Sequence, residues 1–205
     1  MAILIENTID ECFDGDVRPR ARTTSSVFHR LTFRNDDGAG KWDYVYPIPD
    51  QKLTAPLVAA RFRDRRSCGD WRDRPGVATG GQMPYHGLIK PSGVLQQALR
   101  LEDMGAHALK FNATGLGWAV VGDFRVERPT SAQWETCVWL GAHMMALGQK
   151  LFGHTERKGT SRNLDKQCPG QYFDMNRLRI EAASMAEGLD AHTATKQLRA
   201  QGMVI

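Results

Sequence analysis

The segment GLGWAVVGDF at residues 115–124 constrains the fold of this chain most, because its core WAVV is apolar without alternation. A strand with one face in water alternates apolar and polar side chains, whereas an unbroken apolar run is typical of a strand buried on both faces. We therefore expect residues 115–124 to form an inner strand of a sheet that other elements cover.

The segments around this strand predict further strands and helices in alternation. Residues 25–33 (SSVFHRLTF) and 150–156 (KLFGHTE) have the composition of strands, and residues 85–99 predict a β-hairpin that turns at Ser92 and Gly93. Thr130 and Gln133 predict a capping box for the helix that follows, and Asp174 a cap for the next helix. A last short helix is expected at about 191–200. This order predicts an α/β fold with a central mixed β-sheet flanked by helices.

Length and composition predict a single domain with extensions, since the chain has 205 residues of which 41% are hydrophobic. Residues 1–24 mix acidic and basic clusters, and we interpret them as an N-terminal arm, with order beginning near Ser25. The domain spans residues 25–180 and contains an insertion at about 36–82, irregular from Trp42 to Pro49 and with a short basic helix at 53–66. Residues 181–205 are expected to form a C-terminal helical tail.

Charge and cysteine usage exclude several classes of protein. No stretch approaches the roughly 20 apolar residues of a membrane helix, and the acidic start lacks the features of a secretory signal, so we expect a cytoplasmic protein where it is synthesised. The four cysteines show no pairing pattern typical of a disulfide scaffold. The net charge of +4 favours an acidic partner, which could be nucleic acid, an anionic membrane surface or an anionic wall polymer.

Five side chains suited to zinc stand at or near predicted strand ends or in adjoining loops: His29, His86, His107, His154 and Cys168. A catalytic zinc site needs only three protein ligands, because its fourth position holds water. The long separations exclude a compact zinc-finger pattern. The fold therefore has to bring the ligands together, and the residue types alone leave open which three they are.

The order and wording of these segments resemble a known family. VFHRLTF, PYHGLIKPSG, GAHALKFN with GLGWAVVGDF, FGHTE and DKQCPGQYFDM follow one another as in the type 2 N-acetylmuramoyl-L-alanine amidases. Phage endolysin amidases and animal peptidoglycan-recognition proteins share that fold. The resemblance covers about residues 25–180. It implies a zinc-dependent enzyme that hydrolyses the amide bond between N-acetylmuramic acid and L-alanine in bacterial peptidoglycan.

Carried over by position, the resemblance implies that His29, His154 and Cys168 bind Zn²⁺, while Tyr85 and Lys166 assist the reaction. A cysteine in the third place is typical of the endolysin and recognition-protein branch. Recognition proteins that only bind wall fragments usually lack it, so Cys168 favours an active enzyme. Where the family commonly has His-His-Thr, this chain has His29 followed by Arg30.

The remaining candidates are interpreted from their neighbours. Because adjacent strand residues face opposite ways, Tyr85 in the site implies a structural role for His86. We expect His107 and Asn112 to contact substrate. His143 and Cys137 are interpreted as structural residues of the helix that contains them.

The leading hypothesis is a phage-type endolysin, made without a signal peptide, monomeric, and acting on the cell wall after release. One alternative is a non-catalytic module that binds peptidoglycan, and another is an intracellular amidase acting on soluble muropeptides. A nucleic-acid-binding protein is not expected, because the arginine-rich segment 61–74 has no recognised nucleic-acid motif beside it.

Overall fold

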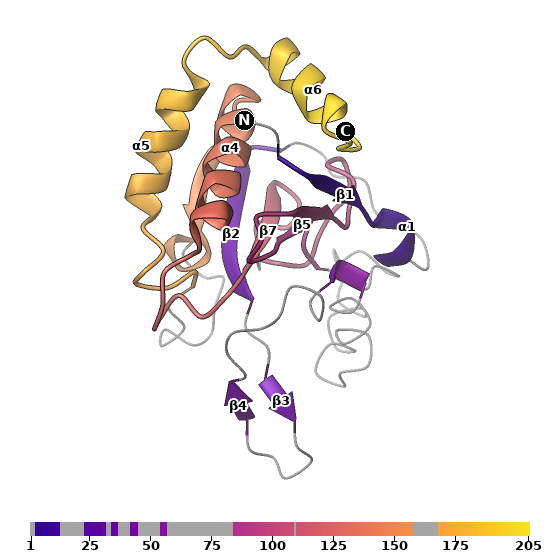
Figure 1. Ribbon diagram of the computed structural model, residues 1–205. Coiled ribbons are helices and arrows are strands. Elements are labelled where there is room, and N and C mark those ends of the chain that lie inside the picture. Colours follow the sequence, from indigo (N-terminus) through magenta and orange to yellow (C-terminus); the bar gives the residue numbers. More distant parts are fainter. Residues whose placement is uncertain are drawn as a thin grey trace.

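The computed structural model describes residues 3–12, 23–31, 34–36, 42–44, 54–56, 84–108, 110–157 and 168–205. Its centre is a six-stranded sheet with the strand order β1-β6-β5-β7-β2-β8 (Figure 1). Within this sheet only β5 and β6 pair antiparallel, and every other neighbouring pair is parallel. The predicted mixed sheet of a single α/β domain is therefore confirmed. The strands are β1 (Ile5–Asn7), β2 (Ser25–Leu31), β5 (Gly87–Ile89), β6 (Leu95–Gln97), β7 (Gly115–Val121) and β8 (Lys150–Gly153).

The longer helices begin where the sequence predicts. At the start of α4 (Ser131–Ala146), the Thr130 hydroxyl accepts the Gln133 N–H and the Gln133 side chain accepts the Thr130 N–H, both at 3.1 Å. Asp174 caps α5 (Met175–Ala186), and α6 (Ala191–Ala200) begins after Asp190. The shorter elements are α1 (Ile9–Cys12) and the 3₁₀ turn η2 (His154–Glu156). No helix in the described ranges is long and apolar enough to cross a membrane.

Strand β7 is buried along its whole length, which confirms the prediction from its apolar run. Along β7, large and small side chains alternate. Leu116, Trp118 and Val120 join the main core, which also contains α4 residues, whereas Ala119 belongs to a second, smaller core cluster. Gly115, Gly117 and Ala119 alternate with the large residues, so they share the face of the second cluster. One face of the sheet is therefore built for packing against α4, and the other has a floor of small residues.

The N-terminal residues differ from the expectation. Strand β1 is an edge strand of the central sheet and α1 follows it, so the prediction that order begins near Ser25 is wrong for these residues. Ile3 and Ile5 are buried in the main core. A three-residue strand is too short to show a period, and its partner β6 lies far along the chain, so local patterns do not disclose it.

Most of the predicted insertion at about 36–82 lies outside the described residues. Within it, β4 (Trp42–Tyr44) pairs antiparallel with β3 (Arg34–Asp36) as a separate two-stranded sheet below the central one in Figure 1. The expectation of irregular structure is therefore wrong for residues 42–44, again because a short strand is defined by its partner. The predicted basic helix at 53–66 is described only at residues 54–56, and the arginine-rich segment 61–74 lies outside the described ranges.

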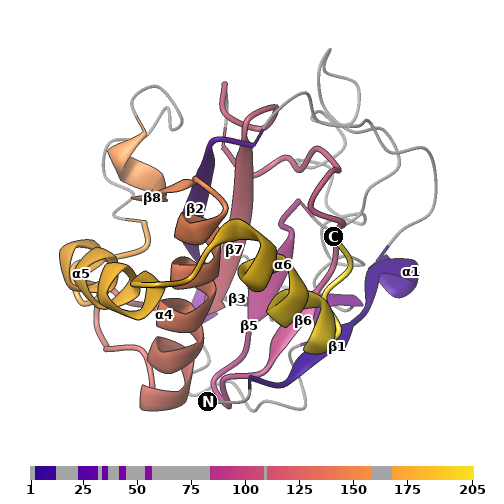
Figure 2. The same cartoon turned by 90° about the horizontal axis from the view of Figure 1, so that it is seen from above.

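The C-terminal residues are packed into the domain. Helix α5 lies along the outer side of α4, and α6 crosses above the sheet (Figures 1 and 2). Leu198 in α6 is fully buried and joins the main core together with Met203. The side chain of Gln97 in β6 exchanges two hydrogen bonds of 2.7 Å with the backbone of Val204. The predicted tail thus covers the core and ties the chain end to the sheet.

Candidate metal centre

His29 lies in β2 on the small-residue face of the sheet. Its neighbour in the register is Ala119 of β7, and it is 2% exposed. Arg30 points to the opposite face, as strand geometry requires, and its guanidinium lies 3.8 Å from the Asp123 carboxylate. Arg30 therefore does not alter the face of the sheet on which His29 lies.

His154 begins the turn η2, directly after β8, and Cys168 is tied to that turn. The backbone N–H and the hydroxyl of Thr155 both donate to the Cys168 carbonyl oxygen, at 2.9 and 3.0 Å. A side chain at Gly153 would come within 2.8 Å of Pro169, so glycine is needed for this close approach. Glu156 accepts the Gly153 N–H at 2.7 Å and pairs with Arg179 of α5. These contacts fix the two segments side by side.

The structure brings His29, His154 and Cys168 together from three separate parts of the chain. One ligand atom from each lies within 4.8 Å of the other two, and the rings of His29 and His154 have centroids 4.5 Å apart. Two imidazoles and one thiolate form a donor set that zinc accepts, and three protein ligands leave a fourth position for water. The chemistry of the donor set therefore fits a catalytic zinc ion.

Electrostatics keep the His29 imidazole neutral. Burial, together with the neighbouring rings of His107 and His154, holds the pKa of His29 well below its ordinary value. The imidazole is therefore neutral at pH 7 and retains a nitrogen lone pair. A neutral imidazole is the form of histidine that metals bind.

Tyr85 and His86 lie in different surroundings. The Tyr85 ring lies beside His29 with centroids 5.1 Å apart and packs against the second core cluster. His86 is fully buried; its Nδ1 accepts the Gly117 N–H at 2.9 Å, and its Nε2 lies 3.0 Å from the Asp103 carbonyl oxygen. His86 thus ties a loop to β7, which is the structural role expected for it.

Of the other predicted site residues, the structure describes His107 and Asn112 but not Lys166. His107 is 7% exposed, with Nδ1 3.2 Å from His29 Nε2 and Nε2 2.9 Å from the Gly115 carbonyl oxygen. Asn112 accepts the Ala108 N–H at 2.8 Å, which closes the loop next to His107. Lys166 lies outside the described residues. The contact between His29 and His107 was not predicted from the sequence, although the small residues of β7 mark the space that the His107 ring occupies.

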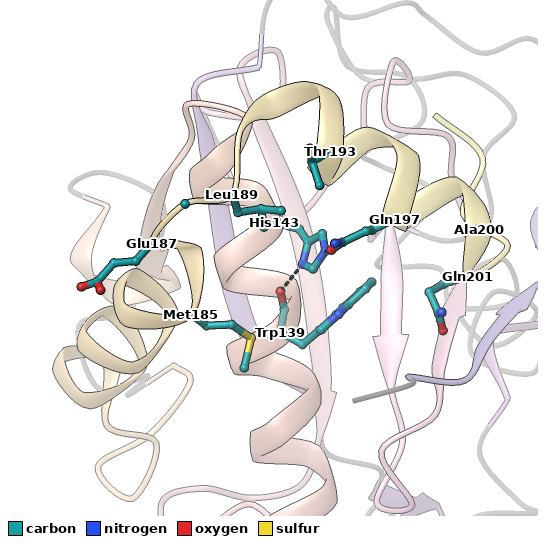
Figure 3. Close-up of a pocket in the computed structure, with 10 residues that line it drawn as sticks. Trp139, His143, Met185, Glu187, Leu189, Thr193, Gln197, Ala200 and Gln201 are labelled. Atoms are coloured by element: carbon teal, nitrogen blue, oxygen red, sulfur yellow. Dashed lines mark hydrogen bonds between the residues drawn. The ribbon is translucent and has the colours of Figure 1, made fainter.

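A hollow of about 540 Å³ lies away from these residues, between α4 and α6 (Figure 3). His143 in its wall has Nδ1 2.7 Å from the Trp139 carbonyl oxygen and Nε2 2.8 Å from the Gln197 side-chain oxygen, so it links the two helices. Cys137 is fully buried, and burial raises the pKa of its thiol. The structural roles expected for His143 and Cys137 agree with these contacts. A smaller hollow, of about 400 Å³, borders Cys168 itself.

The chain matches a known family by sequence. The sequence profile of the N-acetylmuramoyl-L-alanine amidases matches residues 52–171, a range that contains Tyr85, His154 and Cys168 and begins after His29. None of the curated protein sequences matches the chain.

Solved structures with a similar fold come from two groups of proteins. The endolysin N-acetylmuramoyl-L-alanine amidase LysCS from Clostridium intestinale has a TM-score of 0.65 at 17% identity, over 89% of this chain and 97% of that one. The endolysin of the Thermus scotoductus bacteriophage Ph2119 has a TM-score of 0.60 at 16% identity, over 87% and 98%. Drosophila peptidoglycan recognition protein SD has a TM-score of 0.56 at 16% identity, over 83% and 90%. At these identities the likeness is one of fold.

Proposed function

Because the chain belongs to the N-acetylmuramoyl-L-alanine amidase family, we propose that it hydrolyses the amide bond between N-acetylmuramic acid and L-alanine in bacterial peptidoglycan. The observation that carries this proposal is the convergence of His29, His154 and Cys168, whose ligand atoms lie within 4.8 Å of one another. These three residues would hold Zn²⁺. A zinc ion in such a site supplies a Lewis acid and lowers the pKa of bound water toward neutrality.

Tyr85 is the proposed proton-handling residue. The support is the position of its ring beside that of His29, one of the proposed zinc ligands. A phenol with an ordinary pKa of about 10 is protonated at neutral pH, so it acts first as a hydrogen-bond donor that orients the reacting groups. Tyr85→Phe removes only the hydroxyl. We expect a loss of about 10²–10⁴-fold in kcat with zinc affinity unchanged.

Lys166 is the proposed source of positive charge for the oxygen that becomes negative when the amide carbonyl is attacked. The support is its place in the sequence, two residues before Cys168. In other enzymes, removal of one group that stabilises such a negatively charged oxygen lowers kcat by about 10²–10³-fold. We expect Lys166→Ala to lose activity by that order while it retains zinc, and full activity in this variant would refute the assignment.

The proposed setting is that of a phage-type endolysin, synthesised in the cytoplasm and acting as a monomer on the cell wall after release. Its support is the similarity in fold to endolysins over nearly their whole length. The recognition proteins of the same fold make a non-catalytic peptidoglycan-binding module the second candidate. The three-ligand cluster favours the enzyme, because binding wall fragments alone does not require a metal site with an open position.

A comparison of substrates tests this proposal. The protein is incubated with purified peptidoglycan sacculi and, separately, with soluble muropeptides, and the products are identified by mass spectrometry. We expect stem peptides with a free L-alanine amino group from the sacculi, and faster turnover of sacculi than of soluble muropeptides. Sacculi that bind the protein without any bond being cut would support the recognition module, and cleavage restricted to soluble muropeptides would support the intracellular amidase.

A further inference from the structure

We propose that His107 is a positioning residue for the metal centre: it accepts a hydrogen bond from Nε2 of His29 and so leaves Nδ1 of His29 as the zinc-binding nitrogen. This inference rests on the proposed zinc site and adds a residue to it. It also gives His107 a role other than the substrate contact expected from the sequence, because both of its ring nitrogens have partners within the protein.

The carbonyl oxygen of Gly115 fixes which atoms donate in the contacts from His29 through His107 to Gly115. Nε2 of His107 lies 2.9 Å from the carbonyl oxygen of Gly115, which can only accept, so this nitrogen carries a hydrogen. A neutral imidazole carries one N–H, so with its hydrogen on Nε2 the His107 ring has its lone pair on Nδ1.

The same reasoning then fixes the tautomer of His29. Its Nε2 lies 3.2 Å from the lone pair on His107 Nδ1, so the His29 Nε2 carries the hydrogen. The lone pair of His29 is left on Nδ1. Without a partner at Nε2 the neutral ring could exchange tautomers and rotate, and both changes would remove the lone pair from the metal position. Hydrogen bonds of this kind orient metal-binding histidines in many proteins.

Glycines provide the space for the His107 ring. A Cβ atom at Gly117 would lie 2.4 Å from Cγ of His107, and one at Gly105 would lie 3.2 Å from its Cδ2. The ring thus lies directly on the backbone of β7 and meets the His29 ring edge-on, with an interplanar angle of 85°. The bond from Ala108 to Asn112 holds the neighbouring loop. The position of His107 is therefore set by several independent contacts.

Zinc affinity of a small set of variants tests the proposal, measured by competition with a chromophoric chelator on protein whose folding is checked by circular dichroism. His107→Phe keeps a ring but removes both nitrogens, and we expect zinc affinity about 10–100-fold below wild type. His107→Asn places an amide oxygen near the position of Nδ1 and should retain most of the affinity. Gly117→Ala displaces the ring without removing it and should weaken zinc binding as well, which provides a second variant if His107→Phe does not fold.

The matched control is His86→Phe, the same substitution in a neighbouring buried histidine. His86 bonds to Gly117 and Asp103 and not to a proposed ligand, so this variant should lower thermal stability and leave zinc affinity unchanged. Equal weakening of zinc binding in His86→Phe and His107→Phe would overturn the proposal, because the effect would then be one of general packing. Unchanged affinity in a folded His107→Phe would overturn it too.

Nitrogen-15 NMR of the histidine rings supplies a readout independent of affinity. We expect hydrogen on Nε2 in both His29 and His107, and a His29 ring protonated on Nδ1 would contradict the inference. Wild-type protein that binds no stoichiometric zinc would overturn the proposed function and this inference with it. Stoichiometric zinc in the wild type combined with an unperturbed His107→Phe overturns the inference alone.

Discussion

If zinc binds as proposed, it should stabilise the folded protein. The proposed ligands lie at positions 29, 154 and 168, so the unfolded chain offers no ready-made site and should bind zinc weakly. At a free zinc concentration of 100 times Kd, the native state gains about 2.7 kcal/mol. In a domain of 150–250 residues, about 1 kcal/mol shifts Tm by roughly 2–4 °C, so we expect an increase of about 5–11 °C.

Cys168→Ser should remove most of this increase. The serine hydroxyl stays protonated at neutral pH and is a poorer zinc ligand than a thiolate. If Kd rises about a hundredfold, the same zinc concentration gives only about 0.4 kcal/mol, which corresponds to roughly 1–2 °C. The assay is thermal unfolding followed by circular dichroism, on protein first stripped with a chelator and then placed in zinc buffers of fixed free concentration.

Cys137→Ala provides the matched control for this experiment. Cys137 is fully buried in α4 and lies outside the three-ligand cluster. This variant should melt at a lower temperature than wild type because a buried group is lost, yet show the full increase with zinc. A wild-type protein whose Tm does not respond to zinc would refute the reasoning, as would an equal response in Cys168→Ser.

Three further predictions concern the scaffold around the site. Thr130→Ala should lower the free energy of unfolding by about 1–2 kcal/mol in urea, because the hydroxyl caps α4 and donates to the Pro91 carbonyl oxygen; Thr130→Ser should keep most of it, and equal losses would argue against the cap. Leu198→Ala should lower it by about 2–5 kcal/mol, because the side chain is fully buried, whereas a loss below about 0.5 kcal/mol would mean that α6 is not part of the core. Hydrogen bonds from Arg125, and to a lesser extent the charge of Arg30, hold the pKa of Asp123 below its ordinary value, so the stabilisation present at neutral pH should be lost as pH falls below about 4. In Asp123→Asn the free energy of unfolding should depend less on pH below about pH 4. An unchanged pH dependence in this variant would exclude the Asp123 carboxylate as the cause.

The features that the sequence predicts well are those that neighbouring residues decide. The capping box of Thr130 and Gln133 spans one turn, and Asp174 bonds to amides two and three residues ahead. The burial of β7 follows from its own apolar run. The candidate ligands were found by residue type and by the resemblance to a family, because no local rule links His29 to Cys168.

The features that the sequence did not predict depend on partners far along the chain. Strand β1 exists because it pairs with β6, and α6 covers the core because Leu198 meets residues of the sheet and α4. The bond between His29 and His107 requires the loop after β6 to fold back over β7, where Gly117 leaves room for the ring. The alternation of small and large residues in β7 is the one local sign of that arrangement.

The most direct test of the proposed function measures zinc and bond cleavage on the same samples. Wild type and Cys168→Ser are purified, their zinc content is determined by mass spectrometry of the metal, and each is incubated with purified peptidoglycan. We expect stoichiometric zinc and release of stem peptides with free L-alanine amino groups from wild type, and neither from Cys168→Ser. Wild-type protein that contains no zinc, or that carries zinc and leaves the bond between N-acetylmuramic acid and L-alanine intact, would contradict it.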